Sequence, residues 1–354
     1  MIVGLHGSYF ARNFGDTLLM NIIYNWIKEA DPNAAVILPF VSSHQEAVEI
    51  LNNEETNSYK KYKVSQCDRF IFGGGGYFGE PKTSWPRKQY WTLRNYVRHI
   101  IWNDQLLKNK IPYAIIGVGV GPISNSFLRK KIIKLFNSAD FVCVRDNESF
   151  NYLKSYGCVN PNVFETTDLA LTVRREKAQG NDKKVLGVHF SIRPEFPQDK
   201  IPAIVSFLKR TSENYTIKLV NDQKGQMSLE KEANITRFIK ENNIDYTQIE
   251  YHDPNTLIEE LNKLDAIVTS KLHVGILGYA LRKPVLSIPN HTKSFRFYKQ
   301  IGRGKFCIAP NEVNEQMLLD AFSECVNTEV VHAQDLTEKA SLVRKMVFNF
   351  LKQA

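Results

Sequence analysis

The chain has 354 residues, a formal net charge of +9, and 43% hydrophobic and 23% charged residues, a composition typical of a folded globular protein long enough for two domains. No apolar run reaches the roughly 18 residues that a membrane-spanning helix needs. The first residues, MIVGLHGSYF, show no basic segment followed by an apolar stretch, so no secretory signal is indicated and we expect a cytoplasmic protein.

The basic charge and the five cysteines narrow the function classes further. The cysteines are scattered without CxxC spacing, so we expect neither a disulfide framework nor a metal site. Lys and Arg are spread along the chain without a recognisable nucleic-acid module, so we expect no nucleic-acid partner. The net positive charge is compatible with anionic substrates or with peripheral contact with the anionic inner face of the plasma membrane. Alternatively, most of the charged side chains only form the solvated surface.

Strand and helix patterns alternate along the first half of the chain. Strands are expected at 1–5, 35–40, 68–73, 111–118, 140–145 and 161–165. The segments between them are amphipathic, and one helix is expected over 88–109 with Trp91, Tyr96, Ile100 and Leu107 on its apolar face. The polar, charged stretch TVRREKAQGNDKK at 172–184 is interpreted as a linker.

The alternation restarts after this linker. Strands are expected at 185–190, 216–221, 248–251, 265–268 and 285–288. Helices are expected at 199–210, 228–241, 254–263, 271–281, 314–325 and 336–352. Such alternation predicts parallel sheets covered by helices. We therefore expect an α/β fold of two Rossmann-like domains facing a cleft, at 1–175 and 183–330, with a C-terminal helix at 335–354 that could pack back on the first domain.

Two motifs of the first half point to chemistry. GLHGSYFARNFGDTLL follows the first strand but is not GxGxxG, so it does not predict a dinucleotide site. Asp16 is interpreted either as the N-cap of the next helix or as a base in the cleft. In FIFGGGGYFGE, four glycines follow an apolar strand, which favours ligand contact over a purely structural turn. Tyr77 and Glu80 are expected at the same mouth, where Tyr77 could stack on a sugar ring.

Two further segments carry weaker signals. IIGVGVGPIS, at 115–124, is a second glycine-rich strand end and includes Gly119. In VRDNESFNYLKSYG, Arg145 ends a strand and is interpreted as a structural ion-pair partner.

The second half places cationic groups at one sheet edge. Arg193 follows the first strand of this half, and Lys271 and His273 open the helix in TSKLHVGILGYALRKPVLSIP, with Thr269 or Ser270 as its N-cap. A helix N-terminus at the carboxyl edge of a parallel sheet attracts anions, and a guanidinium binds carboxylate or phosphate. The sequence therefore predicts that these residues form one half of an anion-binding pocket. The alternative is that Lys271 is a surface lysine and that His273 only packs.

These motifs together resemble the polysaccharide pyruvyl transferase family. The resemblance rests on the order and spacing of RNFGDTLL, FGGGGYFGE, GVGVGP, VRDNES, TTDLAL and TSKLHVGILGYALRKPVLSIP. It implies a two-domain fold similar to the GT-B glycosyltransferases. It also implies transfer of pyruvate from phosphoenolpyruvate to a sugar, as a ketal or acetal, in the synthesis of bacterial capsules, exopolysaccharides or cell-wall polymers.

The resemblance also implies residue roles. Arg193 matches the family's arginine after the first strand of the second domain, and His273 matches the histidine of its Ser-Arg-x-His motif. Lys271 stands where the family usually has Arg, which keeps the charge but loses the fork geometry, and Val274 stands where Gly often follows. The expected donor-binding residues are Arg193, Ser270, Lys271, Leu272 and His273. The expected acceptor-binding residues are Asn13, Gly74, Gly75, Gly76, Tyr77 and Gly119.

For catalysis we expect His273 as the acid and either Asp16 or Glu80 as the base, with phosphoenolpyruvate as co-substrate and neither cofactor nor metal. The acceptor sugar is expected on a lipid diphosphate or a nucleotide. Two other functions stay open: a GT-B glycosyltransferase with a nucleotide-sugar donor, and a non-catalytic sugar- or phosphate-binding protein.

Overall fold

The computed structural model contains two compact units. It describes residues 1–9, 13–41, 43–51, 53–58, 63–81, 83–176, 178, 183–191, 196–223 and 235–353. The first unit comprises Met1–Arg12, Asp16–Leu169 and Asp335–Ala354, and the second comprises Asn13–Gly15 and Ala170–Gln334. Each unit is built on a parallel sheet with helices on its faces, which confirms the predicted fold class of two α/β domains.

The first unit has a seven-stranded sheet in the order β3-β2-β1-β4-β5-β6-β7. The strands are β1 Ile2–His6, β2 Ala35–Leu38, β3 Thr56–Ser58, β4 Arg69–Phe78, β5 Tyr113–Val120, β6 Phe141–Val144 and β7 Val163–Glu165. All pairs are parallel, and Val3 of β1 lies between Val36 and Arg69. The carboxyl ends of the strands therefore lie along one edge of the sheet, where ligands bind in such folds.

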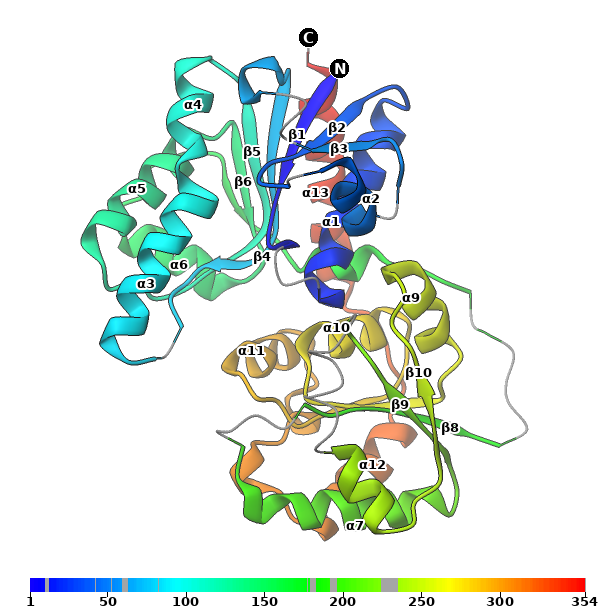
Figure 1. The fold of residues 1–354 in the computed structure, drawn as a ribbon. Coiled ribbons are helices and arrows are strands. Elements are labelled where there is room, and N and C mark those ends of the chain that lie inside the picture. The colour runs from blue at the N-terminus through cyan, green and yellow to red at the C-terminus, as the bar shows by residue number, and fades with distance from the viewer. Residues whose placement is uncertain are drawn as a thin grey trace. The chain divides into compact units, whose positions relative to one another are not determined.

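Helices cover both faces of this sheet. They are α1 Phe14–Ala30, α2 His44–Leu51, α3 Trp85–Asn95, the π-helical turn η3 Tyr96–Ile100, α4 Trp102–Lys108, α5 Ser126–Asn137, α6 Asn147–Ser155 and α13 Gln334–Lys352. Figure 1 shows α3 to α6 on one face and α1 and α13 on the other. The chain end is attached to this sheet, because Arg69 Nε donates to the Phe350 carbonyl at 3.2 Å and the Phe141 and Phe350 rings are 5.8 Å apart.

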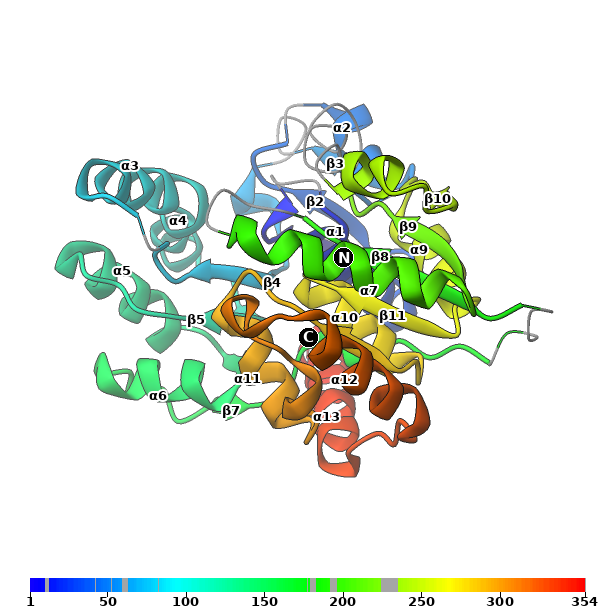
Figure 2. The same ribbon diagram turned by 90° about the horizontal axis from the view of Figure 1, so that it is seen from below.

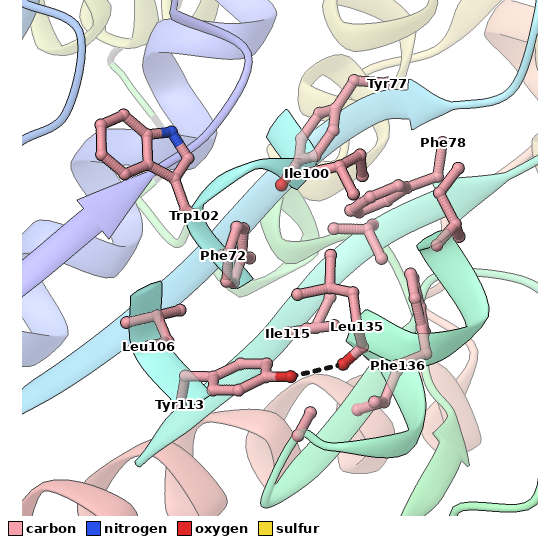
Figure 3. Packing of buried hydrophobic residues seen from close by; sticks show 14 of the residues in the cluster. Phe72, Tyr77, Phe78, Ile100, Trp102, Leu106, Tyr113, Ile115, Leu135 and Phe136 are labelled. Atoms are coloured by element: carbon pink, nitrogen blue, oxygen red, sulfur yellow. Dashed lines mark hydrogen bonds between the residues drawn. The ribbon is translucent and has the colours of Figure 1, made fainter. Parts of the chain in front are cut away.

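The core of the first unit lies between the sheet and α3 to α6 (Figure 3). Phe72 from the sheet and Trp102 and Phe136 from the helices are buried there. The Tyr113 hydroxyl donates to the Leu135 carbonyl at 2.7 Å, so its polar end is satisfied inside the core. Full burial of such side chains stabilises a fold by roughly 1.5–3 kcal/mol each, and this packing fixes the helical layer on the sheet.

The helix expected over 88–109 is interrupted. The π-helical turn η3 adds one residue per turn, which rotates the later side chains relative to a continuous α-helix. As a result Leu106 is fully buried, whereas Leu107, predicted for the apolar face, is 37% exposed. The prediction of which side of this helix is buried was therefore wrong after residue 100.

The strand expected to end at residue 73 continues through all four glycines to Phe78. It continues because β5 also runs on, pairing Gly75 with Val118 and Phe78 with Val120, with a register shift between these pairs. Gly74 and Gly75 have φ values of +38° and +105°, which side chains other than glycine rarely adopt. The glycines thus form an irregular end of a strand rather than a loop.

The second unit has a five-stranded parallel sheet in the order β10-β9-β8-β11-β12. Its strands are β8 Val185–His189, β9 Thr216–Val220, β10 Tyr246–Ile249, β11 Ala266–Thr269 and β12 Val285–Ser287. Its helices include α7 Ile201–Ser212, α9 Pro254–Asn262, α10 Leu272–Ala280, α11 Thr292–Gln300 and α12 Glu315–Asn327. Residues 235–241 are also helical, and the start of the helix expected at 228–241 lies outside the described residues.

The second sheet is also covered on two faces. Figures 1 and 2 show α7 and α12 on one face, where the Phe207 and Phe322 rings are 5.5 Å apart. Figure 1 shows α9, α10 and α11 on the other face. Helix α10 is buried from Val274 to Ala280, so its first turn is fixed at the carboxyl end of β11.

Candidate functional site

Three charged or titratable side chains meet at the carboxyl edge of the second sheet. His189 is the last residue of β8, Asp222 follows β9, and Lys271 follows β11. Asp222 Oδ1 lies 3.2 Å from His189 Nε2, and Oδ2 lies 2.8 Å from Lys271 Nζ. The parallel register brings these strand ends side by side, so residues 33 to 82 positions apart form one cluster, the His189–Asp222–Lys271 cluster.

Asp222 is the anionic centre of this cluster. Its side chain is buried, which by itself would raise its pKa, but His189 and Lys271 outweigh this effect and hold the pKa well below its ordinary value. The carboxylate is therefore ionised at neutral pH and fixes Lys271 in place. We did not predict Asp222 from the sequence; the available signal was its position in the NDQ turn just after a strand.

Helix α10 begins differently from our prediction. Its N-cap is Lys271, whose backbone is extended and whose side chain makes no capping bond, so the prediction of Thr269 or Ser270 was wrong. Both hydroxyls bind loop backbone instead. Thr269 Oγ1 accepts from Lys271 N–H at 2.9 Å, and Ser270 Oγ accepts from Ser191 N–H at 3.0 Å. Leu272 is the first helical residue, and Arg193 lies outside the described residues.

His273 lies in the first turn of α10, directly against Gly15. A Cβ atom at Gly15 would stand 2.0 Å from His273 Nδ1 and 2.8 Å from His273 Cβ. Only glycine therefore fits at position 15 with the imidazole in this orientation.

The segment Asn13–Gly15 belongs to the second unit. Phe14 N–H donates to the Asp222 carbonyl at 2.8 Å, and Asn13 forms an antiparallel bridge with Gln223. We expected Asn13 on the acceptor side with the first domain, but its contacts place it with the loop that carries Asp222. The NFG motif thus supports the His189–Asp222–Lys271 cluster.

Asp16 lies at the carboxyl edge of the first sheet, near the end of β1. It is the third residue of α1, so the prediction that it is the N-cap was wrong, because the helix begins two residues earlier at Phe14. A Cβ atom at Gly75 would lie 3.5 Å from Asp16 Oδ1 and 2.8 Å from Ser8 Cβ. Asp16, Ser8 and Gly75 therefore lie together, and the next glycine, Gly76, is partly exposed.

Packing accounts for the first two glycines of the run. A Cβ atom at Gly73 would stand 2.2 Å from Ile23, and one at Gly74 would stand 2.5 Å from Leu19, so α1 lies directly on the backbone of β4. Ligand contact is not needed to explain these two glycines.

Tyr77 is a buried residue rather than an exposed platform. Its ring stacks on His99 at 4.3 Å and 21°, and its hydroxyl donates to the Gly73 carbonyl at 3.2 Å. Burial and then the charge of Asp16 raise its pKa. His6 Nε2 lies 2.8 Å from His99 Nδ1, and burial lowers the pKa of His6 to about 3, so His6 is neutral at neutral pH. The covered Tyr77 ring is not placed to stack on a sugar.

Glu80 holds two loops together. It pairs with Lys88 at 3.0 Å and accepts from Ser124 N–H and Oγ–H at 2.8 and 2.7 Å. Burial alone would raise its pKa, but these hydrogen bonds and the Lys88 charge leave it lowered. A carboxylate stabilised in this way is a weak base.

Gly119 also has a packing role. A Cβ atom there would stand 2.8 Å from Arg145 Nε. Arg145 is buried and lies 3.7 Å from both Asp146 and Asp168, so its interpretation as a structural ion-pair partner is confirmed.

Within the described residues, no group of three or more His, Cys, Asp or Glu side chains is placed to hold a metal ion. None of the helices formed by these residues has the length and apolar character to cross a bilayer.

Two parallel-sheet α/β units, with charged side chains at the carboxyl edges of their strands, define a GT-B-like fold. Solved structures with this fold include UDP-GlcNAc 2-epimerase from Neisseria meningitidis bound to UDP-GlcNAc, with 12% identity, 98% and 99% coverage of this chain and that chain, and a TM-score of 0.62. The Methanocaldococcus jannaschii enzyme gives 13% identity, 98% and 100% coverage and a TM-score of 0.57. Anabaena HepE in complex with UDP has 14% identity, 99% and 97% coverage of this chain and that chain, and a TM-score of 0.54.

The sequence defines the family within this fold. The model for polysaccharide pyruvyl transferase matches residues 13–292, and the chain belongs to that family. Among curated proteins no sequence matches the chain. The match begins at Asn13, the first residue of the segment that contacts the Asp222 loop, and it extends through α10.

Proposed function

We propose that this protein transfers the pyruvyl group of phosphoenolpyruvate to two hydroxyls of a sugar, forming a cyclic ketal. Family membership supports a transferase that acts in polysaccharide synthesis. The observation that carries the donor assignment is the position of Lys271 and His273 at the N-terminus of a helix at the carboxyl edge of a sheet. Helix N-termini and cationic side chains in such a position bind phosphate and carboxylate groups.

Lys271 is the proposed phosphate ligand. Its ammonium group has three N–H donors, and Asp222 fixes its position at 2.8 Å while leaving donor capacity for a ligand. Because Asp222 offsets one positive charge, the remaining attraction for the anionic donor comes from the first N–H groups of α10 and from Arg193, which we propose as the carboxylate ligand.

His273 is the proposed acid. It gives one proton to the methylene carbon of phosphoenolpyruvate, which becomes the methyl group of the ketal. One sugar hydroxyl bonds to C2, the C2–O bond to phosphate breaks, and the second hydroxyl bonds to C2. The two hydroxyls release two protons, of which one replaces the proton used by His273 and the other leaves with the phosphate.

Asp16 is the proposed base for the attacking hydroxyl. It follows Gly15 directly in the chain, and Gly15 lies against the imidazole of His273. Ser8, Gly75 and Gly76 lie near Asp16 in the first unit and are the proposed acceptor contacts. The proposed acceptor is a sugar on a lipid diphosphate or a nucleotide, in the synthesis of a bacterial capsule, exopolysaccharide or cell-wall polymer.

Calorimetric titration tests the donor assignment. We expect saturable binding of phosphoenolpyruvate, with UDP and GDP as comparators, and a loss of about tenfold or more in affinity in Lys271→Met and in His273→Gln. The control is Lys209→Met, at an exposed lysine in the last turn of α7. Binding of UDP or GDP without binding of phosphoenolpyruvate would overturn the proposal in favour of a nucleotide-sugar glycosyltransferase.

A further inference from the structure

The helical layer of the first unit exposes an unusual number of large apolar side chains. On α3, Trp85 is 72% exposed, Tyr90 67% and Leu93 63%. Val97 and Ile101, in η3 and just after it, are 42% and 37% exposed. We call these five residues the apolar stripe. Single exposed apolar side chains are common on proteins, but a contiguous set marks a surface that binds something.

The stripe follows one face of the helical segment. Tyr90 and Leu93 are three positions apart on α3 and lie on the same side of it, and Val97 and Ile101 continue the exposed surface in the π-helical turn and just after it. The opposite side is buried, and Figure 3 shows Ile100 and Trp102 turned into the core. Figures 1 and 2 show α3 at the outer edge of this layer, beside α5. Since the buried side already holds the segment on the sheet, the exposed stripe is not needed for folding.

Helix α5 extends the apolar surface. Phe127, in its first turn, is 54% exposed, and its ring lies 5.5 Å from that of Tyr96 in η3. Lys131 Nζ lies 5.8 Å from the Phe127 ring, so a basic group borders this aromatic side chain too.

The stripe is bordered by positive charge. Residues 85–103 contain Arg87, Lys88, Arg94 and Arg98 and no acidic residue. Arg87 and Arg94 are seven positions apart and lie on the same side of α3, and Arg98 follows in the π-helical turn; we call these three residues the arginine row. The Arg94 guanidinium lies 5.6 Å from the Tyr90 ring.

The acidic residues nearest in sequence to the stripe are compensated. Glu80 pairs with Lys88, and Asp104 lies 3.6 Å from Lys131 and 2.8 Å from Lys134. The surface therefore combines apolar aromatic side chains with a net positive border.

We propose that the apolar stripe, Phe127 and the arginine row form a docking surface for an anionic phospholipid membrane. Trp and Tyr favour the boundary between headgroups and acyl chains, and arginine guanidinium groups bind the phosphates at that level. A second copy of this chain is a poorer occupant, because it would place two arginine rows against each other. The proposal does not depend on the reaction proposed above, since lipid binding is measured on the protein without substrate.

Sedimentation with vesicles tests this surface. The full chain is mixed with vesicles of phosphatidylcholine alone or of phosphatidylcholine with phosphatidylglycerol. We expect binding to the anionic vesicles that weakens as salt rises, because the arginines contribute through screened charge. Arg87→Gln with Arg94→Gln should reduce the partition coefficient by about thirtyfold, and Tyr90→Gln with Leu93→Gln by about tenfold or more.

Matched controls change equally exposed residues elsewhere. Lys209→Gln with Arg210→Gln removes two exposed charges from α7, and Val331→Gln removes an exposed apolar side chain of the second unit. These variants should bind vesicles as the parent does, and circular dichroism should show all variants folded. Absence of anionic-vesicle binding, or binding that the stripe variants leave unchanged, would overturn the proposal. So would a dimer in sedimentation equilibrium that Tyr90→Gln with Leu93→Gln converts to monomer without lipid binding.

Discussion

Replacement of Asp222 by Asn is the sharpest test of the second-unit cluster. Asn has nearly the same shape but no charge, so it removes the partner of both His189 and Lys271, at 3.2 and 2.8 Å. Removal of one partner from a buried ion pair costs about 3–5 kcal/mol. Because the Lys271 side chain is 28% exposed, water recovers part of this loss, and we expect Asp222→Asn to lower the free energy of unfolding by about 2–3 kcal/mol.

The pH dependence of this difference has a definite sign. The pKa of Asp222 is lowered in the folded protein, so its contribution is fully present above the unfolded pKa of about 3.9 and is lost as pH falls through the folded value. The stability gap between parent and Asp222→Asn should therefore be present at neutral pH and should close in stronger acid.

Urea unfolding followed by circular dichroism measures the gap. Asp245→Asn, at an exposed aspartate, is the control and should change stability by less than about 0.5 kcal/mol. In the double variant Asp222→Asn with Lys271→Met, the unpaired charge is gone, so the loss should be smaller than the sum of the two single losses. A gap below about 0.5 kcal/mol at pH 7, or additive losses in the cycle, would refute the ion-pair argument.

Four further variants distinguish a role in the reaction from a role in packing or stability. Gly15→Ala should displace the imidazole of His273 and lower turnover by about a hundredfold, with a normal circular dichroism spectrum; unchanged turnover would contradict the close contact. Asp16→Asn should lower turnover by a factor of about 10²–10⁴, as expected for loss of a general base. Glu80→Gln should leave turnover intact and lower the free energy of unfolding by about 1–3 kcal/mol. If Glu80→Gln lowered turnover and Asp16→Asn did not, Glu80 would be the base. Since the pKa of His6 falls from 6.5 to about 3 on folding, stability should decrease as pH falls from 6.5 towards 3, and urea unfolding of His6→Gln should show a flatter profile in this window.

The alternation of strands and helices was predictable because parallel sheets require apolar strands and covering helices at regular intervals. Local irregularities were not predictable by the same logic. Glycine has low strand propensity, yet β4 continues to Phe78 because β5 offers it a partner. The spacing of the apolar residues does not predict the π-helical turn at Tyr96–Ile100, because this turn depends on how the segment packs on the sheet.

The candidate site was predictable to the extent that its residues stand next to strand ends. Lys271 and His273 were identified because they follow a strand and open a helix. Asp222 was missed, because one aspartate in a polar turn looks like any surface residue until the sheet order brings β8, β9 and β11 together. Tyr77 was misjudged for the opposite reason, since an aromatic near glycines resembles a binding platform until the structure shows His99 against its ring.

The segment around Gly15 contacts both the Asp222 loop and the start of α10. Phe14 N–H binds the Asp222 carbonyl at 2.8 Å, while the Asp222 carboxylate binds Lys271 at 2.8 Å, so the loop is held through both its backbone and its side chain. The same short segment places Gly15 against His273, two residues after Lys271. A change in any one of these contacts should therefore move both the cation and the imidazole, because Asn13–Gly15 and the SKLH segment contact each other within the second unit although more than 250 residues separate them in the sequence.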